Sequence, residues 1–188
     1  PPLLFDLTTL QKEANRKHGF SADKTLSLAQ ALYEKKIISY PRTGSRYISE
    51  DVFEMIPTLL HQLGITLSQP LNRHAVDDHR VTDHHALLPT GESPEGLSPE
   101  ETMLYQMILS RFIEAFAPNS EEERMQAELS DGTCRYSWRA THRLSLGWRA
   151  YSQDGGKDKA EATDDEEELL EQLPMLAEGE HLPLRHSE

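Results

Sequence analysis

The chain has 188 residues, of which 37% are hydrophobic, and a formal net charge of −13 at pH 7. This length is enough for one sizeable core or two small ones, no run of residues is long and apolar enough to span a membrane, and no secretory signal opens the chain. The single cysteine, Cys134, excludes an internal disulfide framework, and we expect it to be a half-buried strand residue.

The negative charge is unevenly distributed along the chain. Residues 151–188 hold 12 acidic and 3 basic side chains, whereas residues 1–50 hold 8 basic and 5 acidic ones. The net charge argues at first against nucleic-acid binding, but most of the negative charge lies in the C-terminal segment and the first 50 residues are locally basic. Any phosphate contact there has to be local and not driven by the field of the whole protein. The chain also begins at Pro1 without a methionine and ends without a clear helix stop. We expect a fragment of a longer protein, with a processed mature chain as the alternative.

The first predicted helix covers residues 7–20. Thr8 and Gln11 have the spacing of a capping box, and Gly19 suits the position just past the last turn. The pattern therefore predicts both ends of a short helix.

Two further helices are predicted before residue 65. The second covers residues 22–36 and follows Ser21, a favourable N-cap. The third follows Ser49, has two acidic residues in its first turn, is kinked or restarted by Pro57, and ends at Gly64. The apolar side of the second helix is predicted to contain Leu28, Ala29 and Leu32.

A long loop and a fourth helix follow. Residues 66–97 carry little periodicity, which predicts a long ordered loop, usually a functional one in a compact domain. The helix after it has Ser98, Pro99 and Glu101 as a complete N-terminal signature and ends before Pro118. Its buried stripe is predicted to be Met103, Leu104, Met107, Ile108, Phe112, Ala115 and Phe116.

The pattern changes after the fourth helix. A Ser-Asp-Gly turn lies between β-rich runs, which predicts antiparallel strands. An acidic stretch at about 154–171 is predicted to be a flexible loop, and residues 173–186 to form one more strand or two with a turn. The expected fold class is α+β, with a helical domain over residues 1–122 and a β-rich domain over residues 123–188.

The stretch Ser-Tyr-Pro-Arg-Thr-Gly-Ser-Arg-Tyr, residues 39–47, lies between the second and third helices. Pro41 disfavours a helical conformation at Tyr40, and in an extended chain Tyr40 and Arg42 project to the same side. A tyrosine oxygen can attack phosphorus, and a guanidinium can bind the phosphate oxygens and stabilise the transition state. On spacing alone, a packed loop tyrosine with a solvated arginine is the more common arrangement.

Two further groups accompany this pair. Arg46 and Tyr47 suit phosphate contact and base stacking, or a plain surface position. Residues 74–85 contain four histidines and three aspartates, but their spacing matches no zinc pattern, and no metal site is expected. One histidine could donate a hydrogen bond to phosphate or carry a proton. The alternative is a polar loop in which these side chains cap the backbone.

These motifs, taken in order, resemble the type IA DNA topoisomerases, specifically their topoisomerase III branch. The resemblance is carried by "ISYPRTGSRYISED", "VTDHHALLPTG" and "LSPEETMLYQMILSRFIEAFAP", and continues through "LGWRAYS" and "LPMLAEGEHLPL" toward the β-rich arch of that family. It covers most of the chain. It implies an isomerase that cuts and reseals one DNA strand through a 5′-phosphotyrosine without ATP.

The resemblance also implies roles for particular residues and partners. Tyr40 would be the nucleophile, Arg42 would hold the scissile phosphate, and His84 would contact phosphate near the cut. Single-stranded DNA is the expected substrate, a helicase is an expected kind of partner, and the expected location is cytoplasmic and nucleoid-associated. Further DNA contacts are expected from Thr43, Ser45 and Arg46.

The chain departs from the family pattern in two respects. Gly44 stands where the family usually has aspartate, so that charge is dispensable here or activity is altered. Nothing in the chain resembles the Toprim domain that binds Mg²⁺ in the full-length enzymes, so we expect these 188 residues alone to be inactive and to hold no cofactor.

Two alternatives remain open at this stage. The first is a non-catalytic module of the same fold that binds single-stranded DNA or another protein. The second is another tyrosine strand-transferase, such as a recombinase, in which several arginines and a histidine would precede a late tyrosine.

Overall fold

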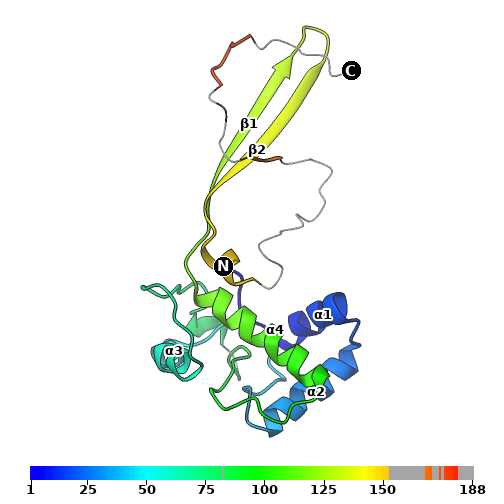
Figure 1. Cartoon of the computed structure of the whole chain (residues 1–188), viewed down its shortest axis with the longest axis vertical. Coiled ribbons are helices and arrows are strands. Elements are labelled where there is room, and N and C mark those ends of the chain that lie inside the picture. The colour runs from blue at the N-terminus through cyan, green and yellow to red at the C-terminus, as the bar shows by residue number, and fades with distance from the viewer. Residues whose placement is uncertain (82, 153–167, 171–173, 175, 182–188) are drawn as a thin grey trace. The chain divides into compact units, whose positions relative to one another are not determined.

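The computed structural model describes residues 1–81, 83–152, 168–170, 174 and 176–181. The chain divides into two compact units, of which the first comprises Pro1–Ser120 and a segment that begins at Leu146. The second unit begins at Glu121. Helices and a three-stranded sheet are both present, which confirms the predicted α+β class (Figure 1). None of the described helices is long and apolar enough to cross a membrane.

An aspartate, Asp6, caps the start of helix α1, Leu7–His18. The Asp6 carboxylate accepts a hydrogen bond from the Thr9 N–H at 2.6 Å, and the Thr9 hydroxyl accepts one from the Asp6 N–H at 3.2 Å. The predicted box of Thr8 and Gln11 is wrong, because Asp6 directly precedes the helix and reaches its free N–H groups. Gly19 ends the helix with φ 69°, as predicted.

Helices α2, Ala22–Glu34, and α3, Glu50–Gln62, have the predicted caps. The hydroxyls of Ser21 and Ser49 each accept from the backbone N–H three residues further on. Pro57 lies inside α3, which continues through it without restarting.

Helix α4, Pro99–Phe116, has the predicted N-terminal signature. The Ser98 hydroxyl accepts from the Glu101 N–H at 3.2 Å, and the Glu101 carboxylate accepts from the Ser98 N–H at 2.7 Å. The predicted stripe is buried except for Met103, which is 41% exposed. Met103 lies one helical turn before the buried Met107, so the helical period does not account for its exposure.

Two hydrophobic clusters meet along α4. One contains Leu10, Leu32 and Ile108 and joins α4 to α1 and α2, whereas the other contains Ile56 and Phe112 and joins α4 to α3. In Figure 1, α4 (green) accordingly lies between the blue helices α1 and α2 and the cyan helix α3. This core is the support on which the segment after α2 rests.

The predicted ordered loop of residues 66–97 is confirmed in its described part. It contains one short 3-10 helix, η1, Asp78–Arg80. Backbone pairing fixes the loop to two other segments, the chain start and the stretch after α2. The pairs are Phe5 with Leu87, Ile38 with Pro89 and Ile48 with Val76.

The second unit contains the predicted antiparallel pair of strands. Strand β1, Glu121–Ser130, pairs with β2, Arg135–Ser145. Strand β3, Glu168–Leu170, pairs parallel to β2, so the predicted flexible loop at 154–171 is wrong for these three residues. The reason is that backbone pairing with a strand edge is independent of side-chain charge. The rest of that stretch lies outside the described residues.

Cys134 is exposed in the turn between β1 and β2, so the expected half-buried strand position is wrong. The Asp131 carboxylate accepts hydrogen bonds from the N–H groups of Thr133 and Cys134 and holds these residues in the turn. In the expected strand region of residues 173–186, the described residues 174 and 176–181 form a turn and no strand.

The second 3-10 helix, η2, Gly147–Tyr151, belongs to the first unit and contains most of the "LGWRAYS" motif. Gly147 has φ 50°, and a Cβ there would lie 2.2 Å from the Asn119 carbonyl oxygen. The Trp148 N–H donates to the Pro118 carbonyl at 2.8 Å. Only glycine fits this close approach, which explains its place in the motif.

Candidate active site

Residues 39–45 form a segment after α2 that is neither helix nor strand, with bends at Ser39 and Pro41. Pro41, Thr43 and Ser45 are buried, whereas Tyr40, Arg42 and Gly44 are exposed. This alternation confirms the prediction that Tyr40 and Arg42 project to one side. The segment is held to the loop by two hydrogen bonds at Ser39, whose N–H donates to the Leu88 carbonyl at 2.9 Å and whose hydroxyl accepts from the Leu88 N–H at 3.0 Å.

Tyr40 lies between two other rings. Its ring centroid is 4.6 Å from that of His84 and 5.4 Å from that of Tyr33, with interplanar angles of 49° and 78°. Tyr40 is 37% exposed, so its ring is held at the surface rather than packed in the core. The structure thus brings Tyr40 and His84 together, although 44 positions separate them along the chain.

Arg42 shares this exposed face. One of its terminal nitrogens donates to Gln30 Oε1 at 3.4 Å, a distance at the long end for a hydrogen bond. A phosphate oxygen carries charge and would be a stronger acceptor than this amide. The guanidinium is therefore on the same exposed side as Tyr40 and is held by a long hydrogen bond.

Thr43 and Ser45 turn their hydroxyls inward. The Thr43 hydroxyl donates to the His84 carbonyl at 3.1 Å, and the Ser45 hydroxyl donates to the Arg80 carbonyl at 2.8 Å. Each residue is only 4% exposed. In this structure they support the loop backbone that carries His84 and do not present hydroxyls at the surface.

Arg46 and Tyr47 are half-buried and do not pair with each other. Arg46 Nε donates to the Leu4 carbonyl at 3.1 Å. The Tyr47 hydroxyl accepts from Arg80 at 2.5 Å, and the Arg80 guanidinium lies 4.9 Å from the Tyr47 ring centroid. The basic–aromatic pair at this end of the segment is therefore Tyr47 with Arg80, a partner that lies 33 positions away along the chain.

Two aspartates of the histidine- and aspartate-rich stretch cap the backbone, as one of the two predicted roles requires, whereas a phosphate-directed role for one of its histidines stays a prediction. The Asp77 carboxylate accepts from the His79 N–H at 3.0 Å, and that of Asp78 from the Glu50 N–H at 3.2 Å. Across the part of the chain that the structure describes, no group of three or more His, Cys, Asp or Glu side chains is placed to hold a metal ion.

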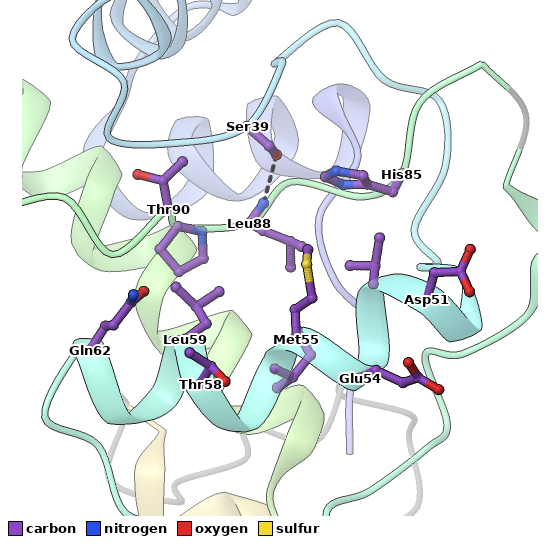
Figure 2. Close-up of a pocket in the computed structure, with 13 residues that line it drawn as sticks. Ser39, Asp51, Glu54, Met55, Thr58, Leu59, Gln62, His85, Leu88 and Thr90 are labelled. Atoms are coloured by element: carbon purple, nitrogen blue, oxygen red, sulfur yellow. Dashed lines mark hydrogen bonds between the residues drawn. The ribbon is translucent and has the colours of Figure 1, made fainter.

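A hollow of about 850 Å³ lies along α3 (Figure 2). Ser39 and His85 line it, whereas their sequence neighbours Tyr40 and His84 do not. Met55 points into the hollow from α3, and the Asp51 and Glu54 carboxylates lie at one end of it. His85 is further fixed by a contact of 2.7 Å between its Nδ1 and the Ala86 carbonyl oxygen.

Sequence reasoning missed the contacts that α2 makes with this segment. Gln30 reaches Arg42 and Tyr33 reaches Tyr40. Their spacing was the available signal. Gln30 and Tyr33 are three residues apart near the end of α2, so they are neighbours on the helix surface next to the segment that follows.

Comparison with known proteins places the chain in one group. A family model described as DNA topoisomerase matches residues 1–188. DNA topoisomerase 3 of Bacillus licheniformis is 37% identical over 201 residues, which cover 98% of this chain and 26% of that protein. DNA topoisomerase 3 of Shouchella clausii is 35% identical over 195 residues, which cover 96% and 26%. The chain thus spans about a quarter of the length of these relatives.

A solved structure has a similar fold. Full-length topoisomerase I from Thermotoga maritima superposes with a TM-score of 0.61 and 28% sequence identity, over 80% of this chain and 27% of that one. The similarity in sequence and the similarity in fold therefore point to the same group of proteins.

Proposed function

This chain belongs to the type IA DNA topoisomerase family, in its topoisomerase III branch, and on that basis we propose that it is the part of a larger enzyme that cuts and reseals one DNA strand. Tyr40 is the proposed nucleophile. The proposal rests on the observation that Tyr40, Arg42 and the ring of His84 share one exposed face.

The chemistry is a transesterification. The Tyr40 oxygen forms a bond to phosphorus while the bond from phosphorus to the 3′ oxygen breaks, so the 5′ phosphate stays on the protein. The phenol loses its proton and the leaving 3′ oxygen gains one. Resealing is the reverse reaction and needs no ATP, because the phosphotyrosine conserves the bond energy.

Arg42 and His84 act on the phosphate in this proposal. The Arg42 guanidinium can exchange Gln30 for the non-bridging oxygens and stabilise the additional negative charge of the transition state. A ring N–H of His84 can donate to the same phosphate. Arg46, Thr43 and Ser45 are proposed to act indirectly, because Arg46 bonds the Leu4 carbonyl and the two hydroxyls bond the loop backbone.

The proposal also covers the cofactor and the partners of the full-length enzyme. The family implies Mg²⁺, but the described residues offer no group of metal ligands. We propose that the full-length enzyme binds this ion through a Toprim domain, which nothing in the present sequence resembles. Single-stranded DNA is the proposed substrate, a helicase is a proposed partner, and a cytoplasmic, nucleoid-associated location follows from DNA as the substrate.

The test is covalent capture of a labelled single strand by the full-length enzyme. Tyr40→Phe keeps the ring and removes the nucleophilic oxygen, so we expect no 5′-linked adduct. Tyr136→Phe, at an exposed tyrosine of β2, is the matched control and should form the adduct normally. An adduct in Tyr40→Phe would contradict the assignment, and DNA binding without an adduct in the wild type would favour the non-catalytic module. The 188 residues alone are expected not to relax supercoiled DNA.

A further inference from the structure

Two side chains of α2 contact the two reactive residues of the neighbouring segment. Tyr33 packs the edge of its ring against Tyr40, with 5.4 Å between centroids and an angle of 78°. Gln30, one helical turn earlier, accepts the hydrogen bond from Arg42. One edge of a helix thus meets both the proposed nucleophile and the proposed phosphate ligand.

Tyr33 contributes little to the core. It is 41% exposed and belongs to neither hydrophobic cluster of the first unit. The Tyr33 ring gains little free energy from burial. Its contact with Tyr40 is therefore the feature that accounts for an aromatic residue at this position.

The Tyr40 ring is held from two directions. His84 contacts it from the loop and Tyr33 contacts it from α2. Edge-to-face packing favours a narrow range of ring orientations. An exposed tyrosine without such neighbours would rotate among several positions, and only some of them would aim its oxygen at a bound phosphate. Orientation of a nucleophile before reaction raises its rate.

We propose that Tyr33 is a positioning residue for the nucleophile, which fixes the Tyr40 ring against His84 through the edge of its own ring. The inference rests on the proposed function, since it needs Tyr40 as the attacking group. It assigns no chemical step to Tyr33 and no role to its hydroxyl.

The test uses Tyr33→Phe and Tyr33→Leu in the full-length enzyme, with single-turnover cleavage of a labelled strand at saturating concentration. Tyr33→Phe keeps the ring edge and should cleave at the wild-type rate. Tyr33→Leu removes it and should cleave roughly 2- to 10-fold more slowly, the effect of losing one aromatic contact. DNA affinity and the unfolding temperature should stay unchanged in both. Tyr136→Leu is the control for removing an exposed tyrosine and should have no effect.

A second measurement, on the 188-residue chain, does not depend on activity. The ring resonances of Tyr40 in an NMR spectrum should shift in Tyr33→Leu and much less in Tyr33→Phe. Equal cleavage by wild type and Tyr33→Leu, or an unchanged Tyr40 resonance, would overturn the inference while Tyr40→Phe remained inactive. Cleavage by Tyr40→Phe would instead overturn the proposed function, and the inference with it.

Discussion

The two sides of the segment after α2 differ in what they contact. On one side, Tyr40 and Arg42 are exposed and Tyr40 meets His84. On the other, Ser39 bonds the backbone of Leu88 and lines the hollow along α3 (Figure 2). The first side offers groups that suit phosphate chemistry, whereas the second mainly attaches the segment to the loop.

The difference shows how neighbours in sequence can serve as controls for one another. His84 and His85 are adjacent, yet His84 contacts the Tyr40 ring and His85 contacts the Ala86 carbonyl and the hollow. In an extended chain, successive side chains point to opposite sides. A substitution at one histidine therefore changes one side and leaves the other intact.

After the loss of the nucleophile itself in Tyr40→Phe, the largest expected effect is at the histidine pair. His84→Ala in the full-length enzyme should slow strand cleavage by about 100-fold or more, the usual cost of losing one donor to a transition state. His85→Ala should slow cleavage far less, because its ring lines the hollow along α3, which Tyr40 does not line. The measurement is single-turnover cleavage per folded molecule, with similar unfolding temperatures required of both variants. Equal rates in the two variants would remove the distinction between the sides and leave Tyr40 and Arg42 as the proposed site.

The second expected effect is on stability and concerns the attachment side. Ser39→Ala leaves the Leu88 N–H without its partner, and Leu88 is only 5% exposed. We expect a loss of about 1–3 kcal/mol in the free energy of unfolding, measured by urea denaturation of the 188-residue chain. Ser39→Thr keeps a hydroxyl and is the matched control. Slower cleavage per folded molecule in Ser39→Ala would mean that the two sides are not independent.

Part of this site could be predicted from sequence. Pro41 and the period of an extended chain predicted that Tyr40 and Arg42 share a side, because that relation depends on adjacent residues alone. The inward hydroxyls of Thr43 and Ser45 could not be predicted, since their acceptors lie on Arg80 and His84, about 35 to 41 positions away. The Tyr47–Arg80 pair was missed for the same reason.

The local sequence also gave two wrong predictions, one for a helix cap and one for a buried position. The capping-box spacing at Thr8 was real, but Asp6 lies closer to the first free N–H groups and replaces it. Met103 was placed in the stripe by its apolar character and its spacing from Met107, but it is exposed near the start of α4. In both cases the residue type was suitable and its position was not.

A smaller effect on stability should appear at the end of α2, just before the segment. Lys35, the C-cap residue of α2, donates to Glu101 at 2.7 Å, and this bond with that from Ser98 keeps the pKa of Glu101 below its ordinary value of 4.5. The folded state therefore binds a proton at Glu101 less readily than the unfolded chain does. The stabilisation is complete above the ordinary pKa and is lost as the pH falls through the lowered one.

Glu101→Gln measures this contribution. Below about pH 4.5, the unfolding temperature of the wild type should fall more steeply than that of Glu101→Gln. The effect should be smaller than that of Ser39→Ala, because Lys35 is 40% exposed and solvent screens the pair. Parallel pH curves for the two proteins would show that the lowered pKa does not contribute to stability.

The smallest expected effect is at Gly44, the residue that departs from the family pattern. Gly44 is exposed on the same side as Tyr40 and Arg42, it is absent from the residues with positive φ, and no atom lies within 4 Å of a Cβ built there. The backbone therefore accepts any L residue, and glycine is not required for the fold. Gly44→Asp should leave the free energy of unfolding within about 0.5 kcal/mol of the wild type.

Gly44→Ala is the matched control, because it adds a Cβ without a charge. The ratio of cleavage rates between the Asp and Ala variants then reports the carboxylate alone. An aspartate on this side would attract the Arg42 guanidinium, but the exposed position screens the interaction and limits the change to about threefold. A change of tenfold or more, in either direction, would show that charge at this position takes part in the chemistry. The exposed face that the segment forms with His84 of the loop would then contain a fourth functional position beside Tyr40, Arg42 and His84.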